Sequence, residues 1–127
     1  MSINKVNIAA AFAGVNEYWA PKIGGDINDA QVKFVKLSGS FHWHHHDQED
    51  ELFLVVKGTL RMQLHVEDGG DIVLEEGEFV IVPKGVEHCP EAVSPEVHCL
   101  LLEPRTTLNT GNVVNDRTRT SLERIAI

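Results

Sequence analysis

The chain has 127 residues, a formal net charge of −8 and 43% hydrophobic residues. This length predicts one domain with a hydrophobic core, and no apolar run approaches the roughly 18 residues that span a membrane. The acidic balance, without a basic stripe of interleaved aromatic residues, argues against a nucleic-acid partner. The N-terminus lacks the pattern of a signal peptide, so we expect a cytoplasmic protein with no membrane association. Cys89 and Cys99 have no CxxC spacing and are predicted to be small, semi-buried residues.

The first predicted element is a short helix over residues 4–13, with Asn4 as its N-cap and Gly14 at its end. Residues 17–28 mix aromatic side chains with proline and two adjacent glycines, which predicts a strand interrupted by a bend or bulge. An alternating strand then starts at Ala30 and ends before a Ser-Gly-Ser turn.

The middle of the chain contains short strands separated by turn signals. Residues 51–56 carry an apolar run without alternation, which predicts a strand buried on both faces. Residues 59–66 alternate between apolar and polar side chains, which predicts a strand with one wet face. Roughly eight or more such strands with little helix predict an all-β sandwich or barrel. The other predicted strands are residues 71–74, 79–82, 88–93 and 97–103.

The composition becomes polar after Pro104. We expect residues 105–127 to form a tail that lies on the surface or on a partner, with a last helical turn near Ser121–Ile127. The expected organisation is a single domain over residues 1–127, whose barrel core covers about residues 17–104.

Four of the five residues that follow Phe41 are histidines. On a strand, side chains two residues apart share a face. His44 and His46 therefore point the same way, and His42 lies two residues earlier on that face. His45 and Trp43 point the other way, and we expect Trp43 to pack in the core.

The nearest carboxylate on the histidine face is Glu51, which follows a short acidic turn. Two imidazoles and a carboxylate on adjacent strands form half of a metal site. The best candidate for a fourth ligand is His88, which follows a tight Pro-x-Gly turn at the start of a strand. An alternative register takes His42 and His44 as ligands and leaves His46 free.

Two segments resemble conserved motifs of the cupin superfamily. Residues 44–58 read HHH-x4-E-x6-G and are similar to the first motif, and residues 77–88 read G-x5-P-x-G-x2-H and are similar to the second. The resemblance implies an all-β, double-stranded β-helix (jelly-roll) barrel, here with a short N-terminal helix and a polar C-terminal tail. It also implies that one divalent metal is bound by four residues: His44, His46, Glu51 and His88.

Three neutral imidazoles and one carboxylate leave one or two coordination positions open, which suits Fe, Mn, Ni, Zn or Cu. We therefore predict a small-molecule metalloenzyme with isomerase-like chemistry on sugars or oxo-acids, or with dioxygenase-like chemistry. His42 is the candidate for acid or base catalysis or for support of a ligand. Scattered lysines and a single arginine within the predicted strands argue against a sugar-phosphate substrate. The alternative is a non-catalytic cupin that binds a small ligand or a metal, such as a sensor.

The apolar strand over residues 52–56 also predicts an oligomer. Another sheet of the same chain can cover one face of this strand, and we expect a second subunit to cover part of the other. The predicted homodimer would include the N-terminal segment or the tail over Thr106–Arg119.

Overall fold

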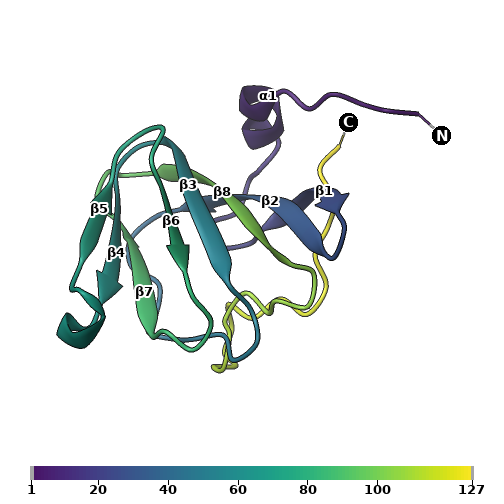
Figure 1. The fold of residues 1–127 in the computed structure, drawn as a ribbon. Coiled ribbons are helices and arrows are strands. Elements are labelled where there is room, and N and C mark those ends of the chain that lie inside the picture. Colours follow the sequence, from purple (N-terminus) through teal and green to yellow (C-terminus); the bar gives the residue numbers. More distant parts are fainter. Residues whose placement is uncertain (1, 127) are drawn as a thin grey trace.

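Two antiparallel β-sheets face each other in the computed structural model, which describes residues 2–126 (Figure 1). The elements are α1 (Ile8–Ala13), β1 (Lys22–Ile27), β2 (Ala30–Leu37), β3 (Glu51–Lys57), β4 (Leu60–Leu64), the 3-10 helix η1 (Val66–Asp68), β5 (Ile72–Leu74), β6 (Phe79–Val82), β7 (His88–Ala92) and β8 (Val97–Pro104). The larger sheet has the order β1-β2-β8-β3-β6 and the smaller one the order β5-β4-β7. This confirms the predicted jelly-roll barrel with a short N-terminal helix and a polar C-terminal segment.

Burial alternates along β3. Glu51, Phe53 and Val55 are buried and face the inside of the barrel, whereas the residues between them are only half-buried. The prediction that this strand is buried on both faces is therefore wrong for the single chain. The physical reason is that α1 covers only part of the outer face, where Phe12 packs edge-on against Phe34 of β2 with 5.2 Å between ring centroids.

The core lies between the two sheets and is formed by the inward-facing side chains of both. The core side chains that are fully shielded from solvent come from three different strands and from both sheets. The core side chains with no measurable exposure are Val55, Leu60, Met62, Val97 and Cys99. This packing fixes the inward face of each strand, and with it the direction of the polar side chains that share that face.

Three local predictions are wrong. The helix is capped by Asn7 rather than Asn4, because the Asn7 side chain accepts a hydrogen bond from the backbone N–H of Ala10 at 2.9 Å. Val66 starts η1 instead of continuing β4, because the Glu-Asp-Gly-Gly turn tightens the chain there. Residues 121–126 form no helical turn, because their backbone pairs with Ile23 of β1 instead.

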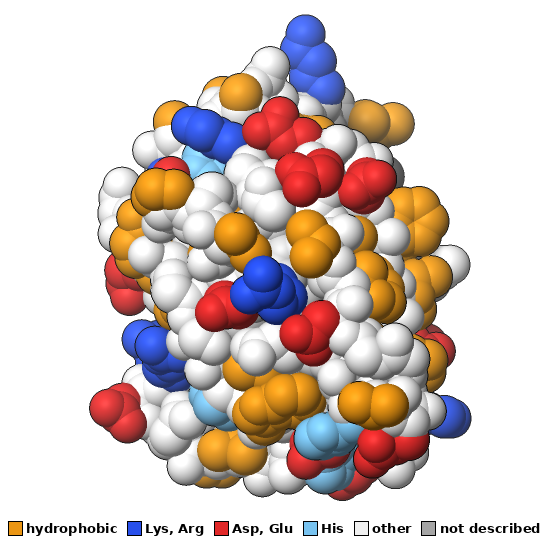
Figure 2. All heavy atoms as spheres, turned by 90° about the vertical axis from the view of Figure 1, so that its left-hand side faces the viewer, with side chains coloured by type: hydrophobic (Ala, Val, Ile, Leu, Met, Phe, Trp, Pro, Cys, Tyr) orange, Lys and Arg blue, Asp and Glu red, His pale blue; other side chains and the backbone are white. Residues whose placement is uncertain are grey.

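Hydrophobic side chains remain exposed on the outer face of the larger sheet. Phe79 and Ile81 lie on its edge strand β6, with 59% and 52% of their surface accessible, and Leu102 of β8 is 38% accessible. Figure 2 shows hydrophobic side chains gathered along its right-hand margin, the side on which β6 and β3 lie. Among residues 2–126, no helix has the length and apolar character needed to span a membrane.

Candidate metal centre

The histidine-rich segment, residues 40–46, lies in the connection between β2 and β3 rather than in a regular strand. It is nevertheless held in an extended register. The backbone N–H of His44 donates to the carbonyl of His88 at 3.0 Å, and the N–H of His88 donates to the carbonyl of His44 at 2.9 Å. Because His88 begins β7, this bridge fastens the segment to the smaller sheet.

The structure brings the four predicted ligands together. His44, His46, Glu51 and His88 each offer one ligand atom, and these atoms lie within 4.8 Å of one another. All four side chains are buried, with at most 4% of their surface accessible. The Oε1 atom of Glu51 lies 3.2 Å from Nε2 of His46 and 3.4 Å from Nε2 of His88. These residues could hold one metal ion.

Backbone carbonyls orient two of the imidazoles. Nδ1 of His44 donates to the carbonyl of His42 at 3.0 Å, and Nδ1 of His88 donates to the carbonyl of Val86 at 2.9 Å. A proton on Nδ1 leaves a lone pair on Nε2, which is the form that ligates a metal. The main chain thus selects the tautomer that a metal site requires.

Buried polar atoms without partners mark the centre of the cluster. Nε2 of His46, Nε2 of His88 and Oε1 of Glu51 are buried and find no hydrogen-bond partner among the described residues. Buried polar atoms in this state are costly, and a cation bound between them would satisfy all three. The donor set therefore fits a divalent transition metal.

The electrostatics favour the protonation states that metal binding needs. Burial, followed by the proximity of His88, lowers the pKa of His44 from 6.5 to about 3. Burial alone would raise the pKa of Glu51, but contacts with Glu103, His46 and His88 hold it well below its ordinary value. At neutral pH the cluster therefore presents a neutral imidazole and an ionised carboxylate.

A narrow cavity of about 40 Å³ adjoins the cluster inside the barrel. Its polar wall includes His44 and Glu51, and part of its apolar wall is formed by Trp19 and Phe41, whose rings stack with 4.6 Å between centroids. A cavity of this size holds a few water molecules or one small functional group. It can thus admit the reacting part of a ligand beside the ligand set.

His42 lies next to the cluster but outside the group of four. Its ring packs against Phe41 with 4.0 Å between centroids, and its Nδ1 lies 3.3 Å from the amide nitrogen of Asn115. Its Nε2 is buried and has no partner among the described residues. Burial, together with the positive charge of Arg117, lowers the pKa of His42.

The C-terminal segment crosses the histidine-rich segment. The side chain of Asn112 accepts a hydrogen bond from the backbone N–H of His45 at 2.8 Å, and the backbone N–H of Asn112 donates to the carbonyl of His45 at 3.0 Å. Arg117 donates to the carbonyl of Ser40 at 3.1 Å and lies 5.4 Å from the centre of the Phe41 ring. The predicted surface tail therefore lies on its own barrel (Figure 1). Its hydrogen bonds to His45 and Ser40 bring it beside the candidate metal centre.

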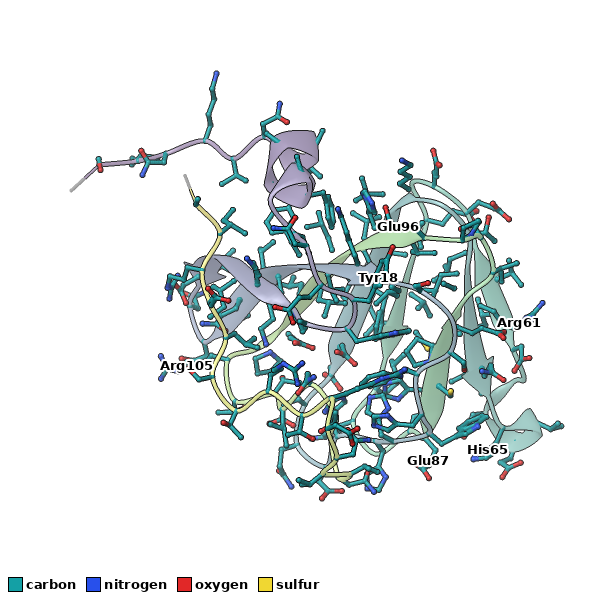
Figure 3. The ribbon with its side chains drawn as sticks, turned by 180° about the vertical axis from the view of Figure 1, so that it is seen from behind. Tyr18, Arg61, His65, Glu87, Glu96 and Arg105 are labelled. Atoms are coloured by element: carbon teal, nitrogen blue, oxygen red, sulfur yellow. The ribbon has the colours of Figure 1, made fainter. Side chains whose placement is uncertain are left out.

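The residues that alternate with the ligands point outward. His45 is contacted by a carboxylate oxygen of Glu87 at 3.1 Å, and Glu87 raises the pKa of His45. The prediction that Trp43 packs in the core is wrong, because 40% of its surface is accessible and its ring stacks on His65 with 4.5 Å between centroids. Figure 3 shows Glu87 and His65 at the end of the barrel opposite Glu96.

Sequence reasoning missed two buried charged residues on the inner face. Lys33 of β2 and Glu103 of β8 form an ion pair, with Nζ 2.7 Å from Oε1, and each has 2% or less of its surface accessible. Strand parity offered a signal, because Glu103 alternates in phase with the core residues Cys99 and Leu101. It could not show that Lys33, far away in the sequence, would be its partner.

Comparison with known proteins agrees with this geometry. The family model for the cupin domain matches residues 33–103, and the chain belongs to this family. Among curated proteins, the chain is similar to the uncharacterized protein YdbB of Bacillus subtilis, with 33% identity over 82 residues, which is 65% of this chain and 71% of YdbB.

Solved structures extend the likeness to most of the chain. A cupin-2 domain containing protein from Shewanella frigidimarina shares 39% identity and a TM-score of 0.73, covering 79% of this chain and 94% of that protein. Protein NMB1881 from Neisseria meningitidis shares 32% identity and a TM-score of 0.70, covering 80% of this chain and 99% of that protein. The relatives therefore support the fold and the family, and their names specify no reaction.

Proposed function

We propose that this cupin is a small-molecule metalloenzyme in which His44, His46, Glu51 and His88 bind one divalent transition metal: Fe, Mn, Ni, Zn or Cu. The observation that carries the proposal is the buried cluster itself, whose ligand atoms lie within 4.8 Å of one another. A metal bound there supplies Lewis acidity and, if it is redox active, electron transfer to or from a ligand. This chemistry suits an isomerase-like reaction on a sugar or oxo-acid, or a dioxygenase-like reaction.

The residues around the cavity determine what can react. The stacked rings of Trp19 and Phe41 exclude water from the apolar wall, while His44 and Glu51 mark the polar end that a carbonyl or carboxylate would approach. A volume of about 40 Å³ favours a small oxo-acid over a bulky substrate. We assign His42 to proton transfer or to support of His44, because its buried Nε2 has no partner among residues 2–126 and its carbonyl accepts from Nδ1 of His44.

A direct test compares bound metal in the wild type and in His46→Ala and His88→Ala. We expect about one equivalent of divalent metal in the wild type and its loss in both variants, because each substitution removes one buried donor. Metal content is measured by elemental analysis after dialysis. His45→Ala is the matched control, since that histidine points outward, and it should keep the metal. Full metal content in both ligand variants would contradict the assignment.

The alternative function is a non-catalytic cupin that binds a small ligand or a metal. The small cavity and the C-terminal segment across the histidine-rich segment favour it over a freely open active site. The two functions are separated by loading metal-free protein with each candidate metal without oxygen and screening sugars and small oxo-acids with and without O₂. Turnover supports the metalloenzyme, and saturable ligand binding without turnover supports the alternative.

We also propose that the protein is a cytoplasmic homodimer. The exposed hydrophobic side chains on β6 and β8 support the dimer, because the outer face of a sheet that carries such residues gains stability when a second copy covers it.

A further inference from the structure

Three ionisable side chains lie in a row across the inner face of the larger sheet. Leu52 of β3 is paired with Leu102 of β8, so Glu51 and Glu103 are neighbours on the inward face. In the next pair of strands, Lys33 lies opposite Leu101, one inward position away from Glu103. The row therefore runs from Lys33 through Glu103 to Glu51, which is one of the four candidate metal ligands.

This row is costly for the fold. The three side chains have 1%, 2% and 4% of their surface accessible, in the order Lys33, Glu103 and Glu51. Removing ions from water costs several kcal/mol for each ion, and replacing a buried ion pair by apolar residues of similar size is often neutral or stabilising. Stability alone therefore does not explain why Lys33 and Glu103 occupy positions that alternate with hydrophobic core residues.

The two ends of the row are fixed in different ways. Lys33 holds Oε1 of Glu103 at 2.7 Å, while Oε2 of Glu103 is buried with no partner among the described residues. Glu103 and Glu51 both line the cavity, and Glu51 directs Oε1 toward His46 and His88. The Glu103 carboxyl group contacts the carboxyl group of Glu51, and two such groups hold each other only when they share one proton. Among residues 2–126, Glu51 receives no main-chain hydrogen bond of the kind that orients His44 and His88.

We propose that Lys33 and Glu103 are positioning residues for the metal centre: Lys33 fixes the Glu103 side chain, and Glu103 holds Glu51 with Oε1 toward the imidazoles. The inference rests on the proposed metal-binding function and deepens it. It assigns to this pair the role that carboxylate and carbonyl partners play behind ligands in metal sites, where their loss typically costs about 10- to 100-fold in metal affinity.

The decisive variant is the double substitution Lys33→Met and Glu103→Leu. It removes the ammonium group and its carboxyl partner together, so neither is left buried without the other, and we expect a folded protein. Co²⁺ serves as the probe, because its visible absorption reports the coordination geometry. We expect Co²⁺ affinity to fall about 10- to 100-fold, with a changed spectrum. Unchanged affinity and spectrum would overturn the positioning role.

Two further variants separate positioning from packing. Glu103→Gln keeps the shape of the side chain and can still bridge Lys33 and Glu51. The Co²⁺ affinity and spectrum of this variant should therefore stay close to those of the wild type. A loss of affinity as large as in the double variant would count against the proposal. Leu101→Ala opens space at the same cavity and leaves all three members of the row in place. It should lower thermal stability and leave the Co²⁺ spectrum unchanged.

The outcomes distinguish this inference from the proposed function. If wild-type protein binds no Co²⁺, the metal-binding function itself fails. If wild type and the double variant bind Co²⁺ equally, only the positioning role fails. Should the double variant not fold, Lys33→Met with Glu103→Gln preserves volume and decides the question. It should lose affinity about tenfold because the introduced glutamine would lack its lysine anchor, and equal affinity would overturn the inference.

Discussion

Two candidate ligands each donate a hydrogen bond from the ring to the main-chain carbonyl of the residue two positions earlier. The carbonyl of His42 accepts from His44, and the carbonyl of Val86 accepts from His88. The orientation of these rings is therefore part of the backbone conformation and does not depend on a bound metal. Among residues 2–126, no main-chain carbonyl anchors the ring of His46 in this way, and its Nε2 lies opposite the carboxylate of Glu51 instead. The site thus combines two rigid imidazoles with a ring and a carboxylate that depend on each other.

The depressed pKa of His44 predicts how acid affects the metal-free protein. In an unfolded chain His44 takes up a proton near pH 6.5, but in the folded protein it does so only near pH 3. The contribution of His44 to stability is therefore present above pH 6.5 and is lost as the pH falls toward 3. The loss is at most about 1.4 kcal/mol per pH unit. Burial and then Glu51 raise the pKa of Glu103. Glu103 therefore lowers the stability of the fold as the pH rises above the pKa that this group has in the unfolded chain.

The test therefore compares the free energies of unfolding of two proteins, so that the effects of other titrating groups cancel. Urea unfolding of metal-free wild type and His44→Asn at several pH values gives the gap between their free energies of unfolding. We expect this gap to narrow as the pH falls below 6.5. A gap that stays constant or widens would contradict the assignment of a neutral, buried His44.

Gly111 offers a second test at the residue scale. It has a φ of +59°, and a side chain there would overlap the carbonyl oxygen of His45. Gly70 also has a positive φ, +77°, but faces open space. We expect Gly70→Ala to cost about 1 kcal/mol from backbone strain alone, and Gly111→Ala to cost about 2–3 kcal/mol and weaken metal binding. Chemical denaturation measures both, and equal costs would show that the segment does not press on the histidines.

The sequence predicted which four residues form the buried cluster of candidate ligands, whereas it did not predict the residues that support them. His44, His46 and Glu51 lie close together in the chain, where strand parity and motif spacing carry information. The partners of Glu103 and of the histidine-rich segment come from 67 to 77 residues away, as the contacts of Asn112, Lys33 and Arg117 show. Such pairs are set by sheet order and by the path of the tail, which local patterns do not specify.

At the scale of elements, most strands began and ended where alternation and turn residues indicated. The strand over Phe79–Val82 agrees to the residue. The strand predicted over residues 17–28, interrupted by a bend or bulge, is shorter in the structure: β1 covers Lys22–Ile27, and its register shifts between Ile23 and Gly25. The position of the tail could not be predicted, because its polar composition indicates that it is exposed but not which surface it lies on. Its irregular path follows individual hydrogen bonds, for example those of Asn112, rather than any period.

The N-cap of α1 can be tested because the predicted cap and the observed cap are different asparagines. Asn7 accepts the hydrogen bond of the N-cap, whereas Asn4 is exposed and lies outside the helix. Asn7→Ala should lower the free energy of unfolding by about 1 kcal/mol, and Asn4→Ala should change it by less than about 0.5 kcal/mol. Thermal or urea unfolding of the two variants measures this, and the reverse order would return the cap to Asn4.

For the whole molecule, the outer face of the larger sheet is the surface to examine. Exposed Phe79 and Ile81 lie on an edge strand, where a second copy can bury them and cover the open edge. Light scattering after size exclusion should give the mass of a dimer for the wild type. Phe79→Glu with Ile81→Lys should give a folded monomer, while the control Val114→Glu, at an exposed site in the tail, should leave the dimer intact. A monomeric wild type would contradict the proposal.

The order of the strands also governs when this protein can fold. β8 lies between β2 and β3 and is the last strand of the barrel in the chain, so β2 and β3 each lack a neighbour until residues 97–104 are available. A ribosome therefore releases most of the barrel before its larger sheet can close, and two apolar strand edges stay open meanwhile. Pairings over such separations form slowly, on the scale of milliseconds to seconds. The nascent chain, rather than the finished barrel, is thus the form most exposed to aggregation.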